Sequence, residues 1–142
     1  MDIRRLTDRY AVSPQIGLAD LPAIRDAGFS TVIDNRPDSE ISGDIQTAKM
    51  RAAAEGLGLV FVANPIIGGA LSQDNVTAQR AAMDASQGPV FAYCASGNRC
   101  AVVWALANAG EMPADDLISI PSRYGYKLEH LRGQINALAS EA

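Results

Sequence analysis

The stretch PVFAYCASGNRC, from Pro89 to Cys100, decides the fold, and it contains both cysteines of the chain. Apolar residues over 88–93 predict a buried strand that ends immediately before Cys94. A short polar loop with a glycine follows, Arg99 closes it, and apolar residues over 100–110 predict a helix. In folds built from such strand–loop–helix units, ligands bind beyond the carboxyl ends of the strands. The loop is therefore predicted to lie at a functional edge of the sheet.

The rest of the chain repeats this alternation. Short strands are predicted over 10–15, 29–34 and 59–63, and helices over 18–28, 44–58 and 72–85, with two further helices after 110. Alternating strands and helices indicate a three-layer α/β fold, with a central, mainly parallel sheet of about four or five strands flanked by helices. A length of 142 residues fits a single domain over 1–142.

Composition and charge exclude several classes of function. The net charge is −4, and Lys and Arg never occur in a run longer than two, which argues against a nucleic-acid surface. No apolar run approaches the roughly 20 residues that span a bilayer. The N-terminal residues lack the apolar core of a signal peptide, and two cysteines six residues apart do not form a disulfide framework. We therefore expect a cytoplasmic protein with neither a nucleic-acid nor a membrane partner.

The loop after Cys94 has the chemistry of an anion-binding site. A thiol attacks as its thiolate, and a strand end just before a helix N-terminus lowers the pKa of a cysteine placed there. Gly97 gives the loop backbone its freedom, and the guanidinium of Arg99 matches an oxyanion. The backbone N–H groups expected to surround the anion are those of Ala95, Ser96, Gly97 and Asn98. The alternative is a strand–turn–helix junction with a buried, inert cysteine.

Nothing in the sequence calls for a metal or another cofactor, because no His/Cys cluster is present. The single histidine, His130, lies in a helical pattern near the C-terminus, where a half-exposed surface position is its ordinary role. Trp104 is expected in the core. Tyr124 and Tyr126 flank Gly125, where they either line a pocket or pack a turn.

The loop YCASGNRC resembles the active-site loop of cysteine-dependent phosphatases and of rhodaneses. Over about residues 6–130, the segments VSPQIGLADLPAIRDAGFSTVIDNRPDSE, AAAEGLGLVFVANPI and GPVFAYCASGNRC are similar to the bacterial β-lactamase-hydrolase-like family, a phosphatase-like domain also labelled a sulfur transferase. The resemblance implies a dual-specificity-phosphatase-like fold with Cys94 as nucleophile and Arg99 as oxyanion-binding residue. It also implies that Asp34 and Arg36 lie near the pocket rim. The alternative for these two residues is a turn held by an ion pair.

The sequence departs from the tyrosine-phosphatase pattern at three places. Four residues separate Cys94 from Arg99, one fewer than in those phosphatases and as many as in rhodanese loops. The phosphatases have an acidic residue ahead of the nucleophile that protonates the leaving oxygen, a contribution of roughly 10²–10⁴ in rate. The corresponding segment here, NPIIGG over 64–69, has no acid, and Asp74 fits the first turn of a helix. Tyr93 stands where the phosphatases have histidine.

These departures favour transfer of sulfane sulfur through a persulfide on Cys94. Phosphate-monoester hydrolysis is the alternative enzyme activity, and a non-catalytic module that binds anions or phosphopeptides is a second alternative. The expected partner is a small sulfur- or phosphate-containing anion, or a protein thiol or phosphoprotein. Cys100 is either a resolving thiol, which attacks an oxidised Cys94, or a small buried residue that fills space.

Overall fold

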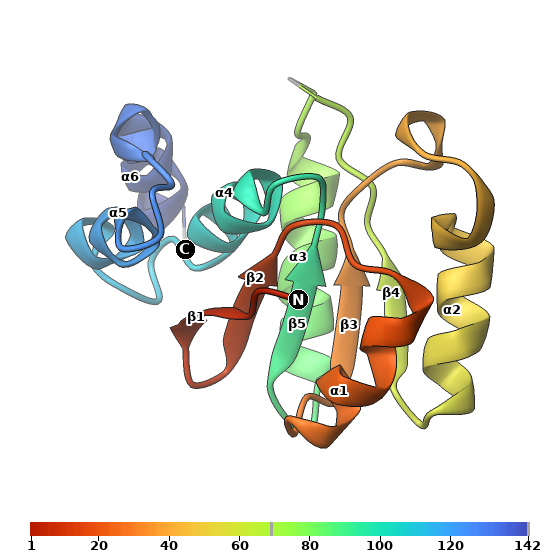
Figure 1. The fold of residues 1–142 in the computed structure, drawn as a ribbon. Helices are drawn as coiled ribbons and strands as arrows, with labels where there is room; N and C mark the ends of the chain where they lie inside the picture. The colour runs from red at the N-terminus through yellow and green to blue at the C-terminus, as the bar shows by residue number, and fades with distance from the viewer. Residues whose placement is uncertain (69, 142) are drawn as a thin grey trace.

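The structure, a computed structural model, describes residues 1–68 and 70–141 and contains a five-stranded sheet (Figure 1). The spatial strand order is β1-β2-β5-β3-β4, and all neighbours are parallel except β1 and β2. This arrangement confirms the predicted mainly parallel sheet. The strands are β1 (Arg4–Thr7), β2 (Tyr10–Ser13), β3 (Thr31–Asp34), β4 (Val60–Ala63) and β5 (Val90–Tyr93).

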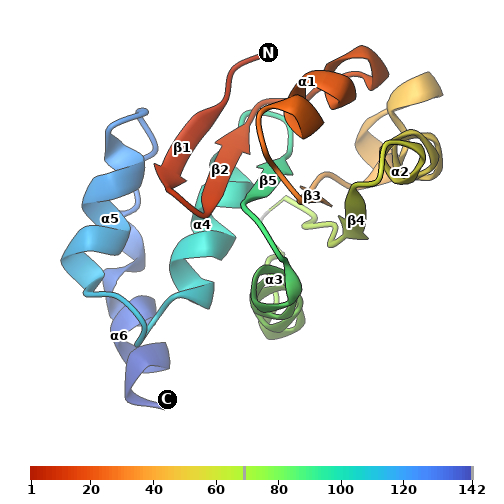
Figure 2. The same ribbon diagram turned by 90° about the horizontal axis from the view of Figure 1, so that it is seen from below.

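Helices cover both faces of the sheet (Figure 2). One face carries the N-terminal helices α1 (Leu21–Asp26) and α2 (Thr47–Gly56). The other face carries α3 and α4, and the two C-terminal helices pack beyond them, at the β1 side of the molecule. These four helices are α3 (Gln73–Ala85), α4 (Asn98–Ala107), α5 (Ala114–Ser122) and α6 (Arg132–Ser140). The three-layer α/β architecture predicted from the alternation of elements is confirmed.

Strand β5 shows how the two faces are filled. Its four residues are all buried, as expected for a central strand covered on both sides. Successive side chains point to opposite faces, so Val90 and Ala92 join the core beneath α3 and α4, whereas Phe91 and Tyr93 join the core beneath α1 and α2. Trp104 of α4 is 2% exposed and stacks on Tyr10 at a ring-centroid distance of 6.2 Å, which confirms its place in the core.

The structure differs from the sequence-based expectation at several boundaries. Strand β1 was missed because RRLT carries two arginines and lies at an edge, where only one neighbour supplies hydrogen bonds. Helix α4 begins at Asn98 instead of residue 100, because Gly97 adopts a left-handed conformation that ends the loop early. The helix expected over 44–58 is reduced to Thr47–Gly56, and a 3₁₀ turn precedes it.

The register of the parallel strands positions the functional edge. Tyr93 of β5 lies opposite Ser13 of β2 on one side and Asp34 of β3 on the other. All three strands therefore end level with one another, and the segments that follow them meet at one edge of the sheet. Among the described residues, no helix combines the length and hydropathy that crossing a bilayer would require.

Candidate active site

Cys94 lies directly after β5, at the base of a loop whose backbone donors turn toward its sulfur. The residue is fully buried, and the N–H of Gly97 donates to Sγ at 3.1 Å. The backbone N–H groups of Arg99 and Cys100 also favour the thiolate. Both belong to the first turn of α4, where N–H groups have no partner within the helix. The sulfur thus occupies the position that suits an anion at a helix N-terminus.

These groups donate to the sulfur itself, whereas the N–H groups of Ala95, Ser96, Gly97 and Asn98 were expected to surround a bound anion, which stays a prediction. Because α4 begins early, the helix N–H groups of Arg99 and Cys100 take part, whereas the N–H of Asn98 donates to Ser96 Oγ at 3.2 Å. The carbonyl of Ala95 accepts from the N–H of Gln15 at 3.2 Å, which ties the loop to the segment after β2.

The two cysteines have opposite pKa shifts. The pKa of Cys94 falls to about 5, chiefly because the Cys100 side chain donates a hydrogen bond to it, and the backbone N–H groups add to this effect against the cost of burial. The pKa of Cys100 rises well above its ordinary value because the side chain is fully buried and faces a thiolate. At neutral pH the pair is therefore a Cys94 thiolate beside a Cys100 thiol. The role of Cys100 as a resolving thiol stays a prediction.

Gly97 has φ +94°, and a Cβ built there would lie 2.2 Å from the hydroxyl oxygen of Tyr126. That hydroxyl donates to the Ser96 carbonyl at 2.8 Å and accepts from Arg4 Nη1 at 2.6 Å. Tyr126 therefore supports the loop from outside, as a packed residue instead of a pocket wall.

Tyr124 is 40% exposed and donates to the Arg5 carbonyl at 3.0 Å.

A buried network of hydrogen bonds through Gln79 and Tyr10 holds the first turn of α4 in place. The Gln79 amide of α3 donates to the Tyr10 hydroxyl at 2.9 Å, and that hydroxyl donates to the Cys100 carbonyl at 3.0 Å. The same Gln79 side chain accepts from Asn35 and Asn64, at the ends of β3 and β4. Buried polar groups that are fully paired hold a single arrangement, so the helix turn that faces Cys94 is held in place.

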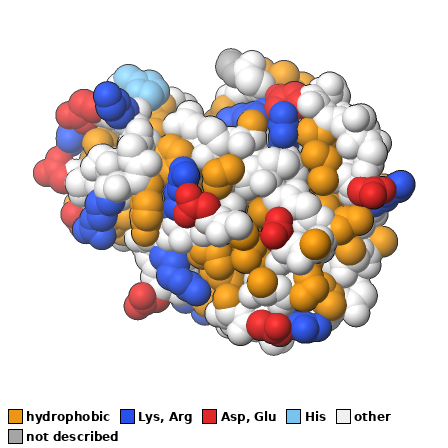
Figure 3. Space-filling view, viewed as in Figure 1, with side chains coloured by type: hydrophobic (Ala, Val, Ile, Leu, Met, Phe, Trp, Pro, Cys, Tyr) orange, Lys and Arg blue, Asp and Glu red, His pale blue; other side chains and the backbone are white. Residues whose placement is uncertain are grey.

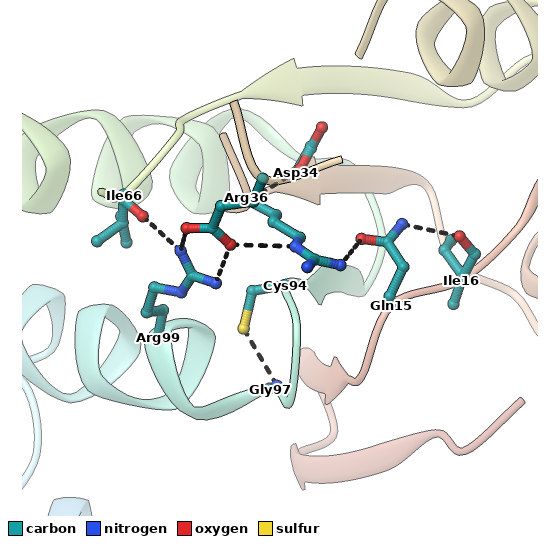
Figure 4. Close-up of polar contacts among 9 residues, drawn as sticks. Gln15, Ile16, Asp34, Arg36, Ile66, Cys94, Gly97 and Arg99 are labelled. Carbon is teal, nitrogen blue, oxygen red and sulfur yellow. Dashed lines mark hydrogen bonds and ion pairs between the residues drawn. The ribbon is translucent and has the colours of Figure 1, made fainter. Parts of the chain in front are cut away.

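The guanidinium of Arg99 lies at the open end of the Cys94 loop, the mouth of the site (Figure 4), and binds the carboxylate of Glu40. Nη1 and Nη2 of Arg99 each donate to one carboxylate oxygen of Glu40 at 2.8 Å, and Nη1 also donates to the Ile66 carbonyl at 2.8 Å. Glu40 thus binds the fork in the bidentate manner that an oxyanion would use. Arg99 first, and Arg36 after it, lower the pKa of Glu40 to about 2.

Glu40 was not among the residues singled out from the sequence. It belongs to the 3₁₀ turn Asp38–Glu40, and its partner Arg99 lies 59 residues further along the chain. The only local signal is the spacing of four residues between Arg36 and Glu40 in RPDSE.

Arg36 and Asp34 lie on different sides of the turn after β3. Arg36 donates from Nε to Glu40 at 3.1 Å and from Nη1 to Gln15 at 3.2 Å, so its guanidinium extends across the mouth above Cys94 (Figure 4). Asp34 is 1% exposed and points away from Cys94. Its carboxylate accepts from the Arg36 N–H and from the Thr47 hydroxyl, each at 2.9 Å. Burial is the main reason that its pKa is raised. Asp34 therefore shapes the turn that presents Arg36.

Tyr93, the residue before Cys94, points to the opposite face of the sheet from the α4 core. Its buried hydroxyl lies near Asp34 but makes no hydrogen bond of normal geometry. Burial, with the nearby Asp34 charge, raises its pKa. The hydroxyl is therefore neutral at neutral pH.

The charges at the mouth balance. The Cys94 thiolate and the Glu40 carboxylate face the guanidinium groups of Arg36 and Arg99.

Asp74 lies in the first turn of α3, as expected, and the described part of the 64–69 segment, residues 64–68, has no acid. Gly69 lies outside the described residues. Within the described chain, no group of three or more His, Cys, Asp or Glu side chains could hold a metal ion.

A hollow of about 370 Å³ borders Arg99 on the α4 side, and His130 also lines it. A larger hollow, of about 440 Å³, lies between α3, α4 and the end of α6 and contacts neither Cys94 nor Arg99. None of the side chains of the Cys94 site lines this larger hollow.

Comparison with known proteins identifies the family. Residues 2–111 match the model of the β-lactamase hydrolase-like protein, phosphatase-like domain, and the chain belongs to this family. A β-lactamase hydrolase-like protein of Agrobacterium fabrum is 28% identical over 126 residues, which cover 87% of this chain and 29% of that protein. The chain thus spans about a third of the length of the curated relatives it matches.

Solved structures support the same fold. A candidate phosphatase of Neisseria meningitidis is 31% identical, with a TM-score of 0.79 over 97% of this chain and 99% of its own. A cysteine-to-serine variant of TpbA from P. aeruginosa, in complex with pTyr, is 12% identical, with a TM-score of 0.69 over 98% of this chain and 88% of its own. The fold is therefore that of the cysteine-based phosphatases.

Proposed function

We propose that this protein transfers sulfane sulfur through a persulfide on Cys94. One observation carries the proposal: the Glu40 carboxylate at the mouth is bound by the guanidinium groups of Arg99 and Arg36, so it cannot serve as an acid. Glu40 is the acidic side chain at the mouth, and a pKa of about 2 leaves it without a proton at neutral pH. A reaction whose leaving group departs as a stable anion fits these groups better than one whose leaving group must be protonated.

The transfer takes two steps. The Cys94 thiolate attacks the outer sulfur of the donor, a new S–S bond forms, and the donor's own S–S bond breaks. The donor departs with that electron pair, as sulfite from thiosulfate or as a thiolate from an organic persulfide. An acceptor thiolate or cyanide then attacks the outer sulfur of the Cys94 persulfide, and the Cys94 thiolate leaves. Neither step needs a proton donor.

The chain's own groups assist these steps. The N–H groups of Gly97, Arg99 and Cys100 stabilise negative charge at Cys94, both as nucleophile and as leaving group. The Cys100 thiol supplies one more hydrogen bond. Arg99 binds the anionic end of the donor when Glu40 gives up part of the guanidinium fork.

Phosphate-monoester hydrolysis is the second candidate, and the comparisons favour it. The family is named for a phosphatase-like domain, and TpbA, which shares the fold, was crystallised with pTyr. Without a proton donor, this activity is expected only on esters with good leaving groups. An aryl phosphate of an acidic phenol fits that condition, whereas phosphotyrosine, whose phenol has a pKa of about 10, does not.

Three assays on wild type and Cys94→Ser separate the candidates. We expect wild type to form thiocyanate from cyanide with thiosulfate or N-acetylcysteine persulfide as donor, above the rate of Cys94→Ser. We expect slow hydrolysis of p-nitrophenyl phosphate and none of phosphotyrosine. Comparable rates on the two esters, with no sulfur transfer, would establish the hydrolase. Sulfate binding without either activity would indicate a binding module.

A further inference from the structure

The hollow beside Arg99 has the composition of a small-molecule site. It lies between α4, the 3₁₀ turn Glu129–Leu131 with α6, and the segment after β4. The space-filling view is hollowed between the lobe that carries the histidine and the main body of the molecule (Figure 3). Its volume of about 370 Å³ falls within the range of ligand pockets, roughly 300–1,000 Å³. Its apolar lining consists of Ile66, Leu71, Val102, Leu106 and Leu131.

Three polar side chains border the same hollow. Asn98, His130 and Gln134 line it, and all three residues are exposed. No hydrogen bond among the described residues uses the side chain of Asn98, His130 or Gln134. Amide and imidazole groups without a protein partner can bind amide or carboxylate groups of a ligand. An apolar floor with a few such groups at its rim is the usual design of a site for small organic molecules.

The hollow borders the reactive loop at Asn98 and Arg99. Arg99 lines the hollow, and its charge also interacts with Cys94. Asn98 and Arg99 are the first two residues of α4, so the same helix turn borders both the hollow and the sulfur. The carbon group of a molecule whose sulfur reaches Cys94 would enter the hollow by moving the Arg99 guanidinium, which Glu40 and the Ile66 carbonyl hold at its border.

The charge at the mouth decides which molecule fits. The guanidinium groups of Arg36 and Arg99 face the Cys94 thiolate and the Glu40 carboxylate. Glu40 already accepts hydrogen bonds from both Nη atoms of Arg99. An inorganic dianion such as thiosulfate must displace the Glu40 carboxylate and finds no excess positive charge. A persulfide places only one negative charge at the mouth, because any carboxylate it bears lies on its carbon group, and burial of the apolar part of that group adds favourable free energy.

We propose that this hollow binds the organic group of the substrate, which is the persulfide of a small thiol bearing amide or carboxylate groups. The inference rests on the proposed function, because it names the donor of that reaction. It makes the hollow a specificity site: the loop around Cys94 performs the transfer, and the hollow selects the carbon group that accompanies the sulfur.

The test fills the hollow without touching the loop. Gln134→Trp places a large side chain at the rim on exposed α6, and Gln87→Trp is the matched control at an exposed position near the start of β5. For Gln134→Trp we expect the KM for N-acetylcysteine persulfide to rise about tenfold and the KM for thiosulfate to change less than about twofold. Gln87→Trp should leave both unchanged. Equal effects on the two donors, or no effect on either, would overturn the inference.

A binding measurement keeps this test separate from the reaction itself. N-acetyl-S-methylcysteine, which has no sulfur to transfer, is titrated into Cys94→Ser with and without Gln134→Trp, and amide chemical shifts are followed. We expect about tenfold weaker binding when the tryptophan is present, with the largest shifts at Asn98 and His130. Unchanged affinity would overturn the inference even if sulfur transfer is observed. Loss of affinity without any sulfur transfer would support the hollow and refute the proposed function.

Discussion

The loop from Cys94 to Arg99 and the segment from Asp34 to Thr47 supply the two parts of this site, and they hold their groups by different means. The loop fixes the sulfur with backbone N–H groups and a left-handed glycine. The segment contributes charged side chains, and its Glu40 side chain is 31% exposed. Partly exposed ion pairs are weak and sensitive to salt, whereas backbone geometry is not. The sulfur of Cys94 is therefore held rigidly, whereas the charged side chains around it can be rearranged.

Replacing Arg99 should give the largest effect, because this residue belongs to both regions. We expect Arg99→Ala to lose about 10²–10³-fold in kcat/KM, the range typical of losing a group that stabilises developing negative charge. The free energy of unfolding should change little, since the Arg99–Glu40 pair is partly exposed. Sulfur-transfer kinetics and urea unfolding measure the two quantities, with Arg25→Ala, in an exposed pair, as the control. Unchanged kinetics would show that Arg99 is structural.

Gly97 tests the rigidity of the loop. Gly97→Ala combines an unfavourable φ with a clash against the Tyr126 hydroxyl, whereas Gly125→Ala has a similar φ of +88° and open space around the added Cβ. We expect Gly97→Ala to destabilise by about 2–4 kcal/mol and Gly125→Ala by about 1 kcal/mol, as seen in urea unfolding. Equal losses would mean that the contact with Tyr126 does not fix the loop.

The pKa of Cys94 tests how the loop stabilises its thiolate. The rate of alkylation by iodoacetamide should titrate near pH 5 in wild type. Cys100→Ala removes the main hydrogen-bond donor and should raise this pKa, whereas Cys100→Ser keeps a donor and should leave it low. A wild-type rate that still climbs past pH 8.5 would contradict the assignment.

The same shift predicts how stability depends on pH. Because the folded thiolate has a pKa of about 5 and the unfolded thiol one of about 9, the unfolded state binds an extra proton between these values. The contribution of Cys94 to the free energy of unfolding should therefore rise with pH across this window and be lost as pH falls through 5. Urea unfolding of wild type and Cys94→Ser at several pH values should show this slope in wild type only.

Replacing Glu40 should give the smallest effect, a change in the affinity for sulfate. Glu40→Gln removes the carboxylate that fills the Arg99 fork, so sulfate should bind several-fold more tightly to this variant in the Cys94→Ser background. Glu55→Gln, in a pair far from Cys94, is the control. Calorimetry at low salt makes the comparison. Weaker sulfate binding would mean that Glu40 positions Arg99 for the anion instead of competing with it.

The sequence predicted the loop well because its chemistry is local. Cys94, Gly97 and Arg99 lie within six residues, and the strand and helix on either side have clear apolar patterns. The alternation of elements predicted the sheet except for strand β1, which was missed because its two arginines give it no apolar strand pattern. Glu40 could not be predicted, because its place depends on the register of β3 beside β5, which brings it to Arg99 across 59 residues.

The donors around the sulfur show a second limit of sequence reasoning. The sequence pattern placed the start of α4 at residue 100, whereas Gly97 ends the loop and places Asn98 in the helix. The early start of the helix brings the N–H groups of Arg99 and Cys100 to the Cys94 sulfur, while the N–H of Asn98 donates to Ser96 Oγ. Helix boundaries depend on backbone geometry that residue patterns define only to within a few residues.

The most direct test of the account is the mass of Cys94 after reaction with a donor. Wild type, Cys94→Ser and Cys100→Ser are treated with N-acetylcysteine persulfide or thiosulfate, and the proteolytic peptide with residues 94 and 100 is analysed. We predict an added mass of about 32 Da, one sulfur atom, on Cys94 in wild type and Cys100→Ser but not in Cys94→Ser. A Cys94 peptide that stays unmodified by both donors, in a protein that hydrolyses aryl phosphates, would contradict the proposed sulfur transfer.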